Sequence, residues 1–293
     1  MEKSIKRIAV FTSGGDAPGM NAAIRAVVRT ANYYDLHVFG INRGYEGMIN
    51  GDLNRLDSRD VGNIIHRGGT ILKTARSDRF RTPEGRKAAF EALQAYDIDA
   101  CIAIGGDGTL TGAKLFCEEY PMPFIGIPGT IDNDLFGTDY TIGYDTAVNT
   151  AVEAVDRIRD TADSHNRLFF IEVMGRNAGY IALSTAIGGG AEAVLLPEDK
   201  MDIDSLIKKL NLGAKKKKLF SVVIVAEGFI EGGAQEVARM VKERFDYYDI
   251  KVTIIGHLQR GGSPSRLDRL IASRLGFAAV ELLLKGETNI MVG

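Results

Sequence analysis

Short apolar runs alternate along the chain with longer amphipathic stretches, and glycine-rich turns lie between many of them. Apolar runs of this length are typical of strands buried in a parallel sheet, and the amphipathic stretches are typical of helices. The pattern predicts strands at 8–11, 37–41, 100–104, 123–128, 168–173, 193–196, 220–226 and 251–255. It predicts helices at 20–34, 60–66, 83–96, 110–118, 144–164, 202–212, 235–245 and 267–284, and another that ends at 187.

This order of elements predicts an α/β fold with mainly parallel sheets and right-handed crossover connections. The number of strands suits two sheets better than one, with a break near Ile142 and a return near Ile255. We find no internal repeat, low-complexity segment or flexible linker in the sequence. We therefore expect two α/β domains.

The stretch Gly105–Thr109, which reads Gly-Gly-Asp-Gly-Thr, connects a predicted buried strand to the start of a helix. This geometry leaves backbone N–H groups unpaired at the helix start, where they can hold phosphate. An aspartate would repel a bare anion, but it fits if Mg²⁺ lies between its carboxylate and the phosphates. Asp107 is therefore the candidate metal ligand of a nucleotide site.

Three further features can contribute to anion or nucleotide binding, and each also has an ordinary structural explanation. Thr12–Gly19 is a second glycine-rich turn after a strand, which is a common geometry in α/β proteins. Arg25 and Arg29 lie four residues apart on a helix, either as a joint anion grip or as two solvated side chains. Tyr45 lies in a predicted turn, where it can stack on a base or pack within the loop.

Polar side chains also gather beyond the ends of predicted strands. Gly129–Asp134 follows a strand and carries two carboxylates and an amide, which are costly to bury. Because ligands of open α/β sheets bind at the carboxyl ends of the strands, we favour a functional site here over a capped turn. Two further groups lie in loops, namely the crowded Arg76, Arg79 and Arg81, which indicate a nearby anion, and His257 with Arg260.

The chain has 293 residues and a formal net charge of −2, so no global positive field favours nucleic acid or membrane partners. Cys101 and Cys117 lie in a predicted strand and the following helix, which suits buried thiols in a reducing compartment. No signal peptide and no apolar run long enough to span a bilayer is recognisable. We therefore expect a cytoplasmic protein.

Five segments together resemble the ATP-dependent 6-phosphofructokinase family, in order and over nearly the whole chain. The segments are Thr12–Asn21, Gly105–Thr109, Pro128–Asp134, Met174–Arg176 and Gly256–Pro264. A glycine–aspartate turn alone also occurs in NAD kinases and lipid kinases, whereas Pro-Gly-Thr-Ile-Asp-Asn-Asp narrows the resemblance. The resemblance implies transfer of the γ-phosphoryl group of ATP to the 1-hydroxyl of fructose 6-phosphate, giving fructose 1,6-bisphosphate in the committed step of glycolysis.

The resemblance also implies an architecture of two Rossmann-like three-layer domains, with the active site in the cleft between them. The larger, ATP-binding domain would comprise 1–142 and 255–293, and the smaller, fructose 6-phosphate-binding domain would comprise 143–254. Arg167 and Lys251 resemble residues that reach into a neighbouring subunit's site. The active unit would therefore be a homotetramer.

Individual roles follow from the same resemblance. Asp132 would accept the 1-hydroxyl proton, with Asp134 helping to orient it, and Arg76 would stabilise the charge of the transferring group. The catalytic set is Asp132, Thr130, Asp134, Arg76, Gly15 and Arg176. The contacts to Mg²⁺-ATP would be Gly15, Tyr45, Arg76, Arg81, Asp107, Gly108, Thr109 and Gly112, with Asp107 on the metal side. The contacts to fructose 6-phosphate would be Thr130, Asp132, Asp134, Arg167, Met174, Gly175, Arg176, Glu227, Lys251, His257 and Arg260.

Two glycines bear on the identity of the phosphoryl donor. Relatives that use pyrophosphate have a bulky aspartate at the position of Gly108, where it fills the space of the α-phosphate, and a lysine at that of Gly129. Both positions are glycine in this chain, which favours ATP. The alternatives are a pyrophosphate-dependent enzyme and a catalytically inactive nucleotide-sensing subunit, although loss of Asp132 or Arg76 would mark the latter and both are present.

The family's effector site, where ADP activates and phosphoenolpyruvate inhibits, has counterparts at Arg25, Arg29, Arg159, Gly190, Glu192, Lys216 and Lys218. A cation bridging Glu192 and a diphosphate would suit this set. The chain departs from its relatives in having Lys251 in place of an arginine, Ser58 in place of an effector-contacting arginine, and Ser77 in place of an aromatic residue near the adenine. Relatives also continue beyond the position of Gly293, and without such a tail we expect exposed apolar surface on the smaller domain.

Overall fold

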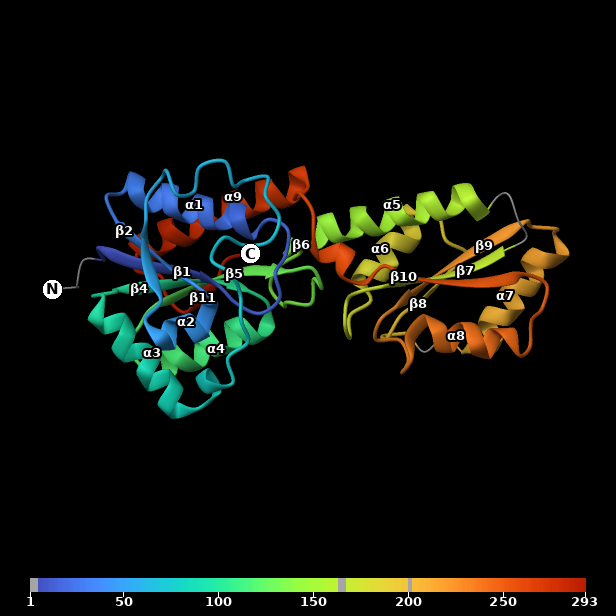
Figure 1. The fold of residues 1–293 in the computed structure, drawn as a ribbon, viewed down its shortest axis with the longest axis horizontal. Coiled ribbons are helices and arrows are strands. Elements are labelled where there is room, and N and C mark those ends of the chain that lie inside the picture. Colours follow the sequence, from blue (N-terminus) through green and yellow to red (C-terminus); the bar gives the residue numbers. More distant parts are fainter. Residues whose placement is uncertain (1–4, 163–166, 200–201) are drawn as a thin grey trace. The chain divides into compact units, whose positions relative to one another are not determined.

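The computed structural model describes residues 5–162, 167–199 and 202–293, and the chain divides into two compact units. Unit 1 comprises the chain up to Thr130 together with Leu135–Asp145 and Arg260–Gly293, and unit 2 comprises Ile131–Asp134 and Thr146–Gln259. Each unit has its own sheet with helices on both faces (Figure 1). The predicted α/β class with mainly parallel sheets is therefore confirmed.

Among the described residues, the sheet of unit 1 has seven strands in the order β11-β5-β4-β1-β2-β3, with β6 paired to the end of β5. The strands are β1 (Arg7–Thr12), β2 (His37–Ile41), β3 (Leu53–Leu56), β4 (Ala100–Gly105), β5 (Phe124–Thr130), β6 (Ile142–Gly143) and β11 (Ile290–Met291). All pairings are parallel except that of β2 with β3. Strands β1, β4 and β5 are adjacent, so the turns that follow them emerge at one edge of the sheet.

Helices α1 and α9 lie on one face of this sheet, and α2, α3 and α4 lie on the other (Figure 1). The helices are α1 (Met20–Tyr33), α2 (Gly44–Asn50), α3 (Pro83–Ala95), α4 (Asp107–Glu119) and α9 (Arg266–Leu284), with the short 3₁₀ turn η1 (Arg79–Arg81). A second 3₁₀ turn, η2 (Gly256–Arg260), lies mainly in unit 2. The core under α2, α3 and α4 is rich in aromatic side chains, including the fully buried Phe11 and Phe116. Removing this apolar surface from water is the main force that holds the helices on the sheet.

Among the described residues, the sheet of unit 2 has four parallel strands in the order β10-β7-β9-β8. The strands are β7 (Arg167–Val173), β8 (Ala193–Leu195), β9 (Phe220–Ala226) and β10 (Asp249–Ile254). The helices are α5 (Tyr144–Ala162), α6 (Tyr180–Gly188), α7 (Ile203–Lys215) and α8 (Gly233–Lys242). Helices α7 and α8 cover one face of this sheet and α5 and α6 the other (Figure 1), and a cluster of buried apolar side chains fills the space under α7 and α8.

Side-chain caps explain where several helices begin. Thr82 accepts a hydrogen bond from the backbone N–H of Gly85 at 3.1 Å, and Pro83 occupies the first position of α3. Ser265 accepts from the N–H of Asp268 at the start of α9, and Asp202 accepts from the N–H of Ser205 at the start of α7. Each cap satisfies a donor that the first turn of a helix leaves unpaired.

Several local predictions were wrong, and the short strands β6 and β11 were not predicted. The segment 60–66 was expected to be helical, but it forms successive turns. The turn expected around Tyr45 is the helix α2, which ends at Asn50 and has its two cap residues, Arg43 and Gly51, in a left-handed conformation. Strand β3 was not expected, and it pairs antiparallel with β2 at the sheet edge. The expected end of the helix at Ser164 lies outside the described residues.

Both cysteines of the chain are free thiols. Cys101 is fully buried in β4, and Cys117 lies in α4, where its Sγ donates to the carbonyl of Met122 at 3.3 Å. Burial raises the pKa of the Cys117 thiol to about 11. Within the part of the chain that the structure describes, no helix is both long and apolar enough to cross a membrane.

Candidate active site

The turn between β4 and α4 has the geometry that was expected of a phosphate-binding site. Gly106 is the N-cap of α4 and has no side chain to cap the helix, so no cap side chain occupies the first backbone N–H groups. Asp107 and Gly108 are exposed, whereas Thr109 is buried. A helix start with free donors and positive dipole stabilises a bound phosphate.

The second glycine-rich turn, Thr12–Gly19, lies directly beside the first. Ser13 donates its N–H to the carbonyl of Ile104 at 3.1 Å, and a Cβ added at Gly14 would lie 3.4 Å from Thr109 Oγ1. A Cβ added at Gly15 would lie 2.5 Å from Nη1 of Arg260, which itself donates to the carbonyl of Asp16 at 3.2 Å. The structure therefore brings three predicted site residues together in unit 1, namely Gly15, Thr109 and Arg260.

Thr130, at the end of β5, borders the same turn. A Cβ added at Gly106 would lie 3.4 Å from the Cβ of Thr130. The carbonyl of Thr130 accepts a hydrogen bond from the hydroxyl of Thr141 at 2.6 Å. The end of β5 is thereby held next to the start of α4, as expected if both touch one phosphoryl group.

Tyr45 is buried and is packed against residues of unit 1 on two sides. Its ring stacks on Phe80 with centroids 3.8 Å apart and an angle of 17° between planes, and its hydroxyl donates to the carbonyl of Thr109 at 2.6 Å. A Cβ added at Gly112 would lie 3.2 Å from the ring. Tyr45 and Gly112, both predicted ATP contacts, are therefore neighbours, and burial raises the pKa of the Tyr45 hydroxyl well above 10.0.

One arginine of the arginine-rich loop before α3 is neutralised by a carboxylate of the chain. Arg79 pairs with Glu46 of α2 at 2.7 Å, so the anion next to this arginine is a carboxylate of the chain itself. Ser77 also donates to Glu46, at 2.6 Å, and this hydrogen bond is the main reason that the pKa of Glu46 is lowered. Arg76 and Arg81, the two predicted ATP contacts in the loop, are exposed.

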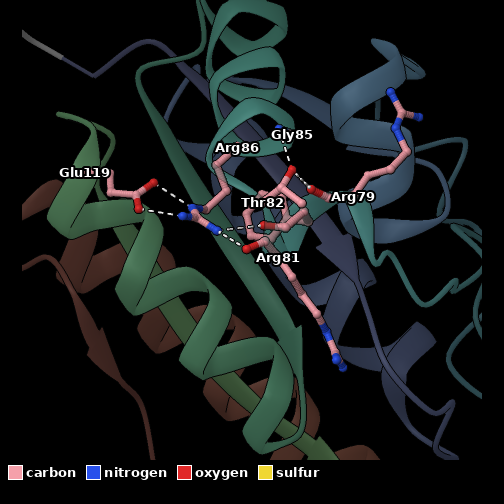
Figure 2. Close-up of polar contacts among 7 residues, drawn as sticks. Arg79, Arg81, Thr82, Gly85, Arg86 and Glu119 are labelled. Carbon is pink, nitrogen blue, oxygen red and sulfur yellow. Dashed lines mark hydrogen bonds and ion pairs between the residues drawn. The ribbon is translucent and has the colours of Figure 1, made fainter.

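Sequence reasoning missed three residues that hold this loop: Glu46, Arg86 and Glu119. Arg86 is 5% exposed and pairs with Glu119 at the end of α4, as Figure 2 shows. An arginine and a glutamate on two amphipathic helices look like ordinary surface residues in a sequence. No local pattern indicates that they meet, because 33 residues separate them along the chain.

Unit 2 carries the predicted base. Asp132 is 3% exposed, and its Oδ2 lies 3.5 Å from Nε of Arg176. Arg176 and the preceding Gly175 both have positive φ, 50° and 139° respectively. The N–H of Arg176 is 3.3 Å from a carboxylate oxygen of Glu227, so the structure brings these predicted sugar-phosphate contacts together.

A buried glutamine that was not predicted holds this part of unit 2. The Oε1 of Gln259 accepts from the N–H of Met174 at 2.8 Å, and its Nε2 donates to the carbonyl of Ala147 at 3.3 Å. Gln259 is fully buried, whereas the neighbouring His257 and, in unit 2, Asp134 are exposed. The amide thus fixes the start of the Met174–Arg176 segment.

The two residues expected to serve a neighbouring subunit lie on adjacent strands of unit 2. Arg167 begins β7 and Lys251 lies in β10, where the register pairs Arg167 with Asp249. The Asp249 carboxylate is 3.8 Å from Arg167 Nε and 3.0 Å from Lys251 Nζ. The hydrogen bond from Lys251 is the main cause of the lowered pKa of Asp249. The two cations are therefore gathered around one carboxylate.

The predicted effector residues fall into two sets. Arg25 and Arg29 lie on α1 of unit 1, with Arg25 half-buried and Arg29 exposed. In unit 2, Lys218 pairs with Glu192, which also accepts from the N–H of Val222. Beside them is a cavity of about 250 Å³, and its lining includes three lysines, Lys209, Lys216 and Lys218, together with leucines of α7.

A guanidinium from α5 borders the same part of unit 2. Arg159 donates to the carbonyl of Gly190, and its guanidinium lies 5.9 Å from the centroid of the Phe220 ring. The structure therefore brings the two predicted effector contacts Arg159 and Gly190 together.

The donor set at the phosphate turn fits a magnesium ion that is bound mainly through its nucleotide. Asp107 offers one exposed carboxylate, and no group of three or more acidic, histidine or cysteine side chains among the described residues is arranged to hold a metal ion. Mg²⁺ commonly keeps several waters and binds through one or two carboxylates plus substrate phosphates. One carboxylate beside free helix N–H groups is therefore a sufficient protein contribution.

Comparison with known proteins decides the family. The model of the phosphofructokinase family matches residues 7–283. The chain is 58% identical to the ATP-dependent 6-phosphofructokinase of Cytophaga hutchinsonii over 289 residues, which cover 99% of this chain and 88% of that protein. The chain belongs to the phosphofructokinase family.

Other phosphofructokinases agree with this assignment. The ATP-dependent 6-phosphofructokinase 1 of Thermus thermophilus is also 58% identical, over 99% of this chain and 89% of that protein. The phosphofructokinase structure from Saccharomyces cerevisiae aligns with a TM-score of 0.91 and 40% identity, over 96% of this chain. This chain covers 42% of that yeast chain, so it spans less than half of its length.

A pyrophosphate-dependent phosphofructokinase is also similar in fold. The structure of such an enzyme from Marinobacter aquaeolei aligns with a TM-score of 0.85 and 27% identity, over 98% of this chain and 78% of that one. The phosphofructokinase fold therefore accommodates both donors, and the choice between them rests on individual residues. At Gly108 of this chain, an added Cβ would meet nothing within 4 Å.

Proposed function

We propose that this phosphofructokinase transfers the γ-phosphoryl group of ATP to the 1-hydroxyl of fructose 6-phosphate, giving ADP and fructose 1,6-bisphosphate. The observation that carries the proposal is the 58% identity, over 99% of the chain, to an enzyme named ATP-dependent 6-phosphofructokinase. The reaction belongs to glycolysis. The pyrophosphate-dependent alternative is disfavoured by the glycine at position 108, and the inactive alternative by the presence of Asp132 and Arg76.

On the sugar side, Asp132 acts as the general base. Its carboxylate takes the proton of the 1-hydroxyl while the hydroxyl oxygen attacks the γ-phosphorus, and the bond to the bridging oxygen of ADP breaks with its electron pair. Arg176, with its Nε 3.5 Å from Asp132, stabilises the ionised carboxylate and orients it. Asp134 and Glu227 contact the sugar, and Met174, Gly175, His257 and Arg260 complete its binding set.

On the donor side, the chain supplies a phosphate cradle and positive charge. The N–H groups at the start of α4 and the Thr12–Gly19 turn hold the phosphates, and Thr130 contacts the transferring group. The exposed guanidinium of Arg76 stabilises the charge that this group carries in the transition state. When bound at Asp107, Mg²⁺ neutralises phosphate charge. Arg81, Tyr45 and Gly112 contact the nucleotide.

The assembly and its regulation complete the proposal. Arg167 and Lys251 bind the sugar phosphate of a neighbouring subunit within a homotetramer, and the lysine lacks the bidentate fork of an arginine. The effector residues bind ADP or phosphoenolpyruvate, which is supported by the unit 2 cavity next to Lys216, Lys218 and Glu192. A cytoplasmic location follows from the use of glycolytic substrates.

A coupled assay tests the donor and the acceptor together. Purified protein is given fructose 6-phosphate and magnesium with either ATP or pyrophosphate as sole donor, and fructose 1,6-bisphosphate is measured. We expect turnover with ATP and none above background with pyrophosphate. Turnover with pyrophosphate alone would reject the assigned donor, and no turnover with either would reject the proposed reaction.

Replacing the base provides a residue-level test. Asp132→Ser is expected to lower kcat by about three orders of magnitude or more, because general base catalysis contributes factors of 10²–10⁴ and the carboxylate also orients the substrate. ATP binding, measured by calorimetry, is expected to change less than twofold. Turnover close to that of the unmodified protein would contradict the assignment of Asp132 as the base.

A further inference from the structure

A buried guanidinium joins the end of α4 to the beginning of α3. Arg86 donates from Nε to Oε2 of Glu119 at 2.6 Å and from Nη2 to Oε1 at 2.7 Å, which is a two-point fork on one carboxylate (Figure 2). The Arg86 side chain is 6% exposed and that of Glu119 is 31% exposed. Such a bidentate, partly buried pair fixes the plane of the guanidinium as well as its position.

The remaining nitrogen of Arg86 binds the backbone of the arginine-rich loop. Nη1 donates to the carbonyl of Phe80 at 3.1 Å. It also donates to the carbonyl of Arg81 at 2.7 Å (Figure 2). Both carbonyls belong to the short η1 turn, which has few hydrogen bonds of its own. Because the carboxylate orients the guanidinium, Glu119 indirectly determines where these two carbonyls lie.

The turn that is held in this way carries two groups on the nucleotide side of unit 1. Phe80 is buried and stacks on Tyr45, whose hydroxyl reaches the carbonyl of Thr109. The side chain of Arg81 is 84% exposed, and its ion pair with Asp78, at 3.9 Å, is long and also exposed. Packing does not fix an exposed arginine of this kind, so its position is set mainly by its backbone.

Helix α4 connects both ends of this arrangement. It begins with Asp107 at the phosphate turn and ends with Glu119, and its 13 residues span about 18 Å at the rise of an α-helix. A rigid helix therefore relates the position of the phosphate turn to that of the carboxylate that holds Arg86.

We propose that Glu119, acting through Arg86, is a positioning residue for nucleotide binding, because it fixes the turn that places Phe80 and Arg81. The inference rests on the proposed ATP site and identifies a residue that supports it without touching the substrate. An isolated surface ion pair would contribute little, but this pair also satisfies two backbone carbonyls.

The main test compares two destabilising variants of the same layer. Glu119→Ala removes the carboxylate, whereas Leu93→Ala removes a fully buried side chain of α3 that lies outside the turn. We expect both to lower Tm. Only Glu119→Ala should raise the KM for ATP, by roughly fivefold to tenfold. This is less than the loss of a direct charged hydrogen bond would cause, because Glu119 acts on the nucleotide only through the turn. The KM for fructose 6-phosphate should stay within twofold.

A conservative variant and a surface control sharpen the comparison. Glu119→Gln keeps an acceptor and should give an intermediate KM for ATP. Glu91→Gln removes the carboxylate of an exposed ion pair within α3, in which Glu91 lies 3.8 Å from Lys87. This variant should leave Tm and both KM values unchanged. An unchanged KM for ATP in Glu119→Ala, or an equal rise for both substrates, would overturn the positioning role.

Direct binding separates this inference from the proposed reaction. Magnesium-ATP is titrated calorimetrically into the unmodified protein and into Glu119→Ala in the absence of sugar phosphate. Binding that weakens in the variant supports the inference whatever the acceptor proves to be. Equal affinities would reject it even if the unmodified protein phosphorylates fructose 6-phosphate, and no binding to either would reject the nucleotide site itself.

Discussion

Gly108 and Gly129 both favour ATP over pyrophosphate as the phosphoryl donor, but their surroundings differ. A Cβ at Gly108 would meet nothing within 4 Å, so this position tolerates side chains. Gly129 is buried in β5, and a Cβ there would lie 3.1 Å from Cγ2 of Ile104 and 3.3 Å from Cε of Met20. A side chain at 129 would therefore crowd its neighbours, whereas the absence of a side chain at 108 has no packing reason.

This difference makes Gly108 the better position for testing donor choice. Gly108→Asp should fold with nearly unchanged stability, since the position is exposed and an acidic residue is favourable in the first turn of a helix. We expect its KM for ATP to rise roughly tenfold or more, equivalent to about 1.4 kcal/mol, because the carboxylate repels and displaces the phosphates.

Gly108→Ala is the matched control, because its methyl group enters the same open space without adding charge. Steady-state kinetics at several ATP concentrations measure both variants, and thermal unfolding confirms that they are folded. A normal KM for ATP in Gly108→Asp would show that this glycine does not select the donor.

At the level of elements, the arginine-rich loop is held from two sides by carboxylates. Glu46 of α2 binds Ser77 and Arg79, and Glu119 of α4 binds Arg86. The hydrogen bond from Ser77 is the main reason that the pKa of Glu46 is lowered, and the hydrogen bond from Arg86 lowers that of Glu119. The contacts that hold the loop to α2 and to α4 therefore both require an ionised carboxylate.

The consequence is a loss of stability in acid. A carboxylate whose pKa is lowered by folding contributes fully above its unfolded pKa, here near 4.5, and its contribution disappears as pH falls through the lower folded value. We expect the free energy of unfolding to decline below about pH 4.5, and to decline less steeply in the double variant Glu46→Gln/Glu119→Gln. Urea unfolding at a series of pH values measures both slopes, and identical slopes would contradict this origin.

The sequence predicted elements well where one physical signal dominated. Strand β9 lies at 220–226 as expected, because the five consecutive apolar residues 222–226, four of them β-branched, end at the charged Glu227. Strand β3 was missed because Leu53–Leu56 has only two apolar residues, and its pairing with β2 supplies what the pattern lacks. Helix α2 was missed because two of its seven residues are glycine, which ordinarily favours turns.

Some residues of the candidate site could be predicted from the sequence, and others could not. Residues next to a turn or strand end, such as Gly15, Asp107 and Asp132, could be found because the turn itself is visible in the sequence. Glu119 and Gln259 could not, because they act through partners that only the fold brings near. Long-range side-chain contacts leave no local pattern.

For the whole molecule, the proposed tetramer leads to a complementation test. Asp132→Ser removes the base and Arg167→Ala removes a residue proposed to serve the neighbouring subunit, so each variant alone should have little activity. In oligomers mixed at equal ratio, about a quarter of the sites should have an intact Asp132 and an intact neighbouring Arg167. We therefore expect activity near one quarter of the unmodified protein.

Co-expression with two different affinity tags isolates the mixed oligomers, and unmixed variants combined after purification serve as the control. Sedimentation establishes the number of subunits. Inactivity of confirmed mixed oligomers would contradict a shared site, and a monomer would contradict the tetramer itself.

The two cysteines also determine how the protein can be labelled. Cys101 is fully buried, and the pKa of about 11 for Cys117 leaves roughly one thiolate in a thousand near pH 8. A maleimide dye should therefore react very slowly with both native thiols and rapidly with a cysteine introduced at an exposed position. Ser58 is exposed and occupies a proposed effector position, so a fluorophore attached to Ser58→Cys would report ligand arrival there without removal of the native thiols.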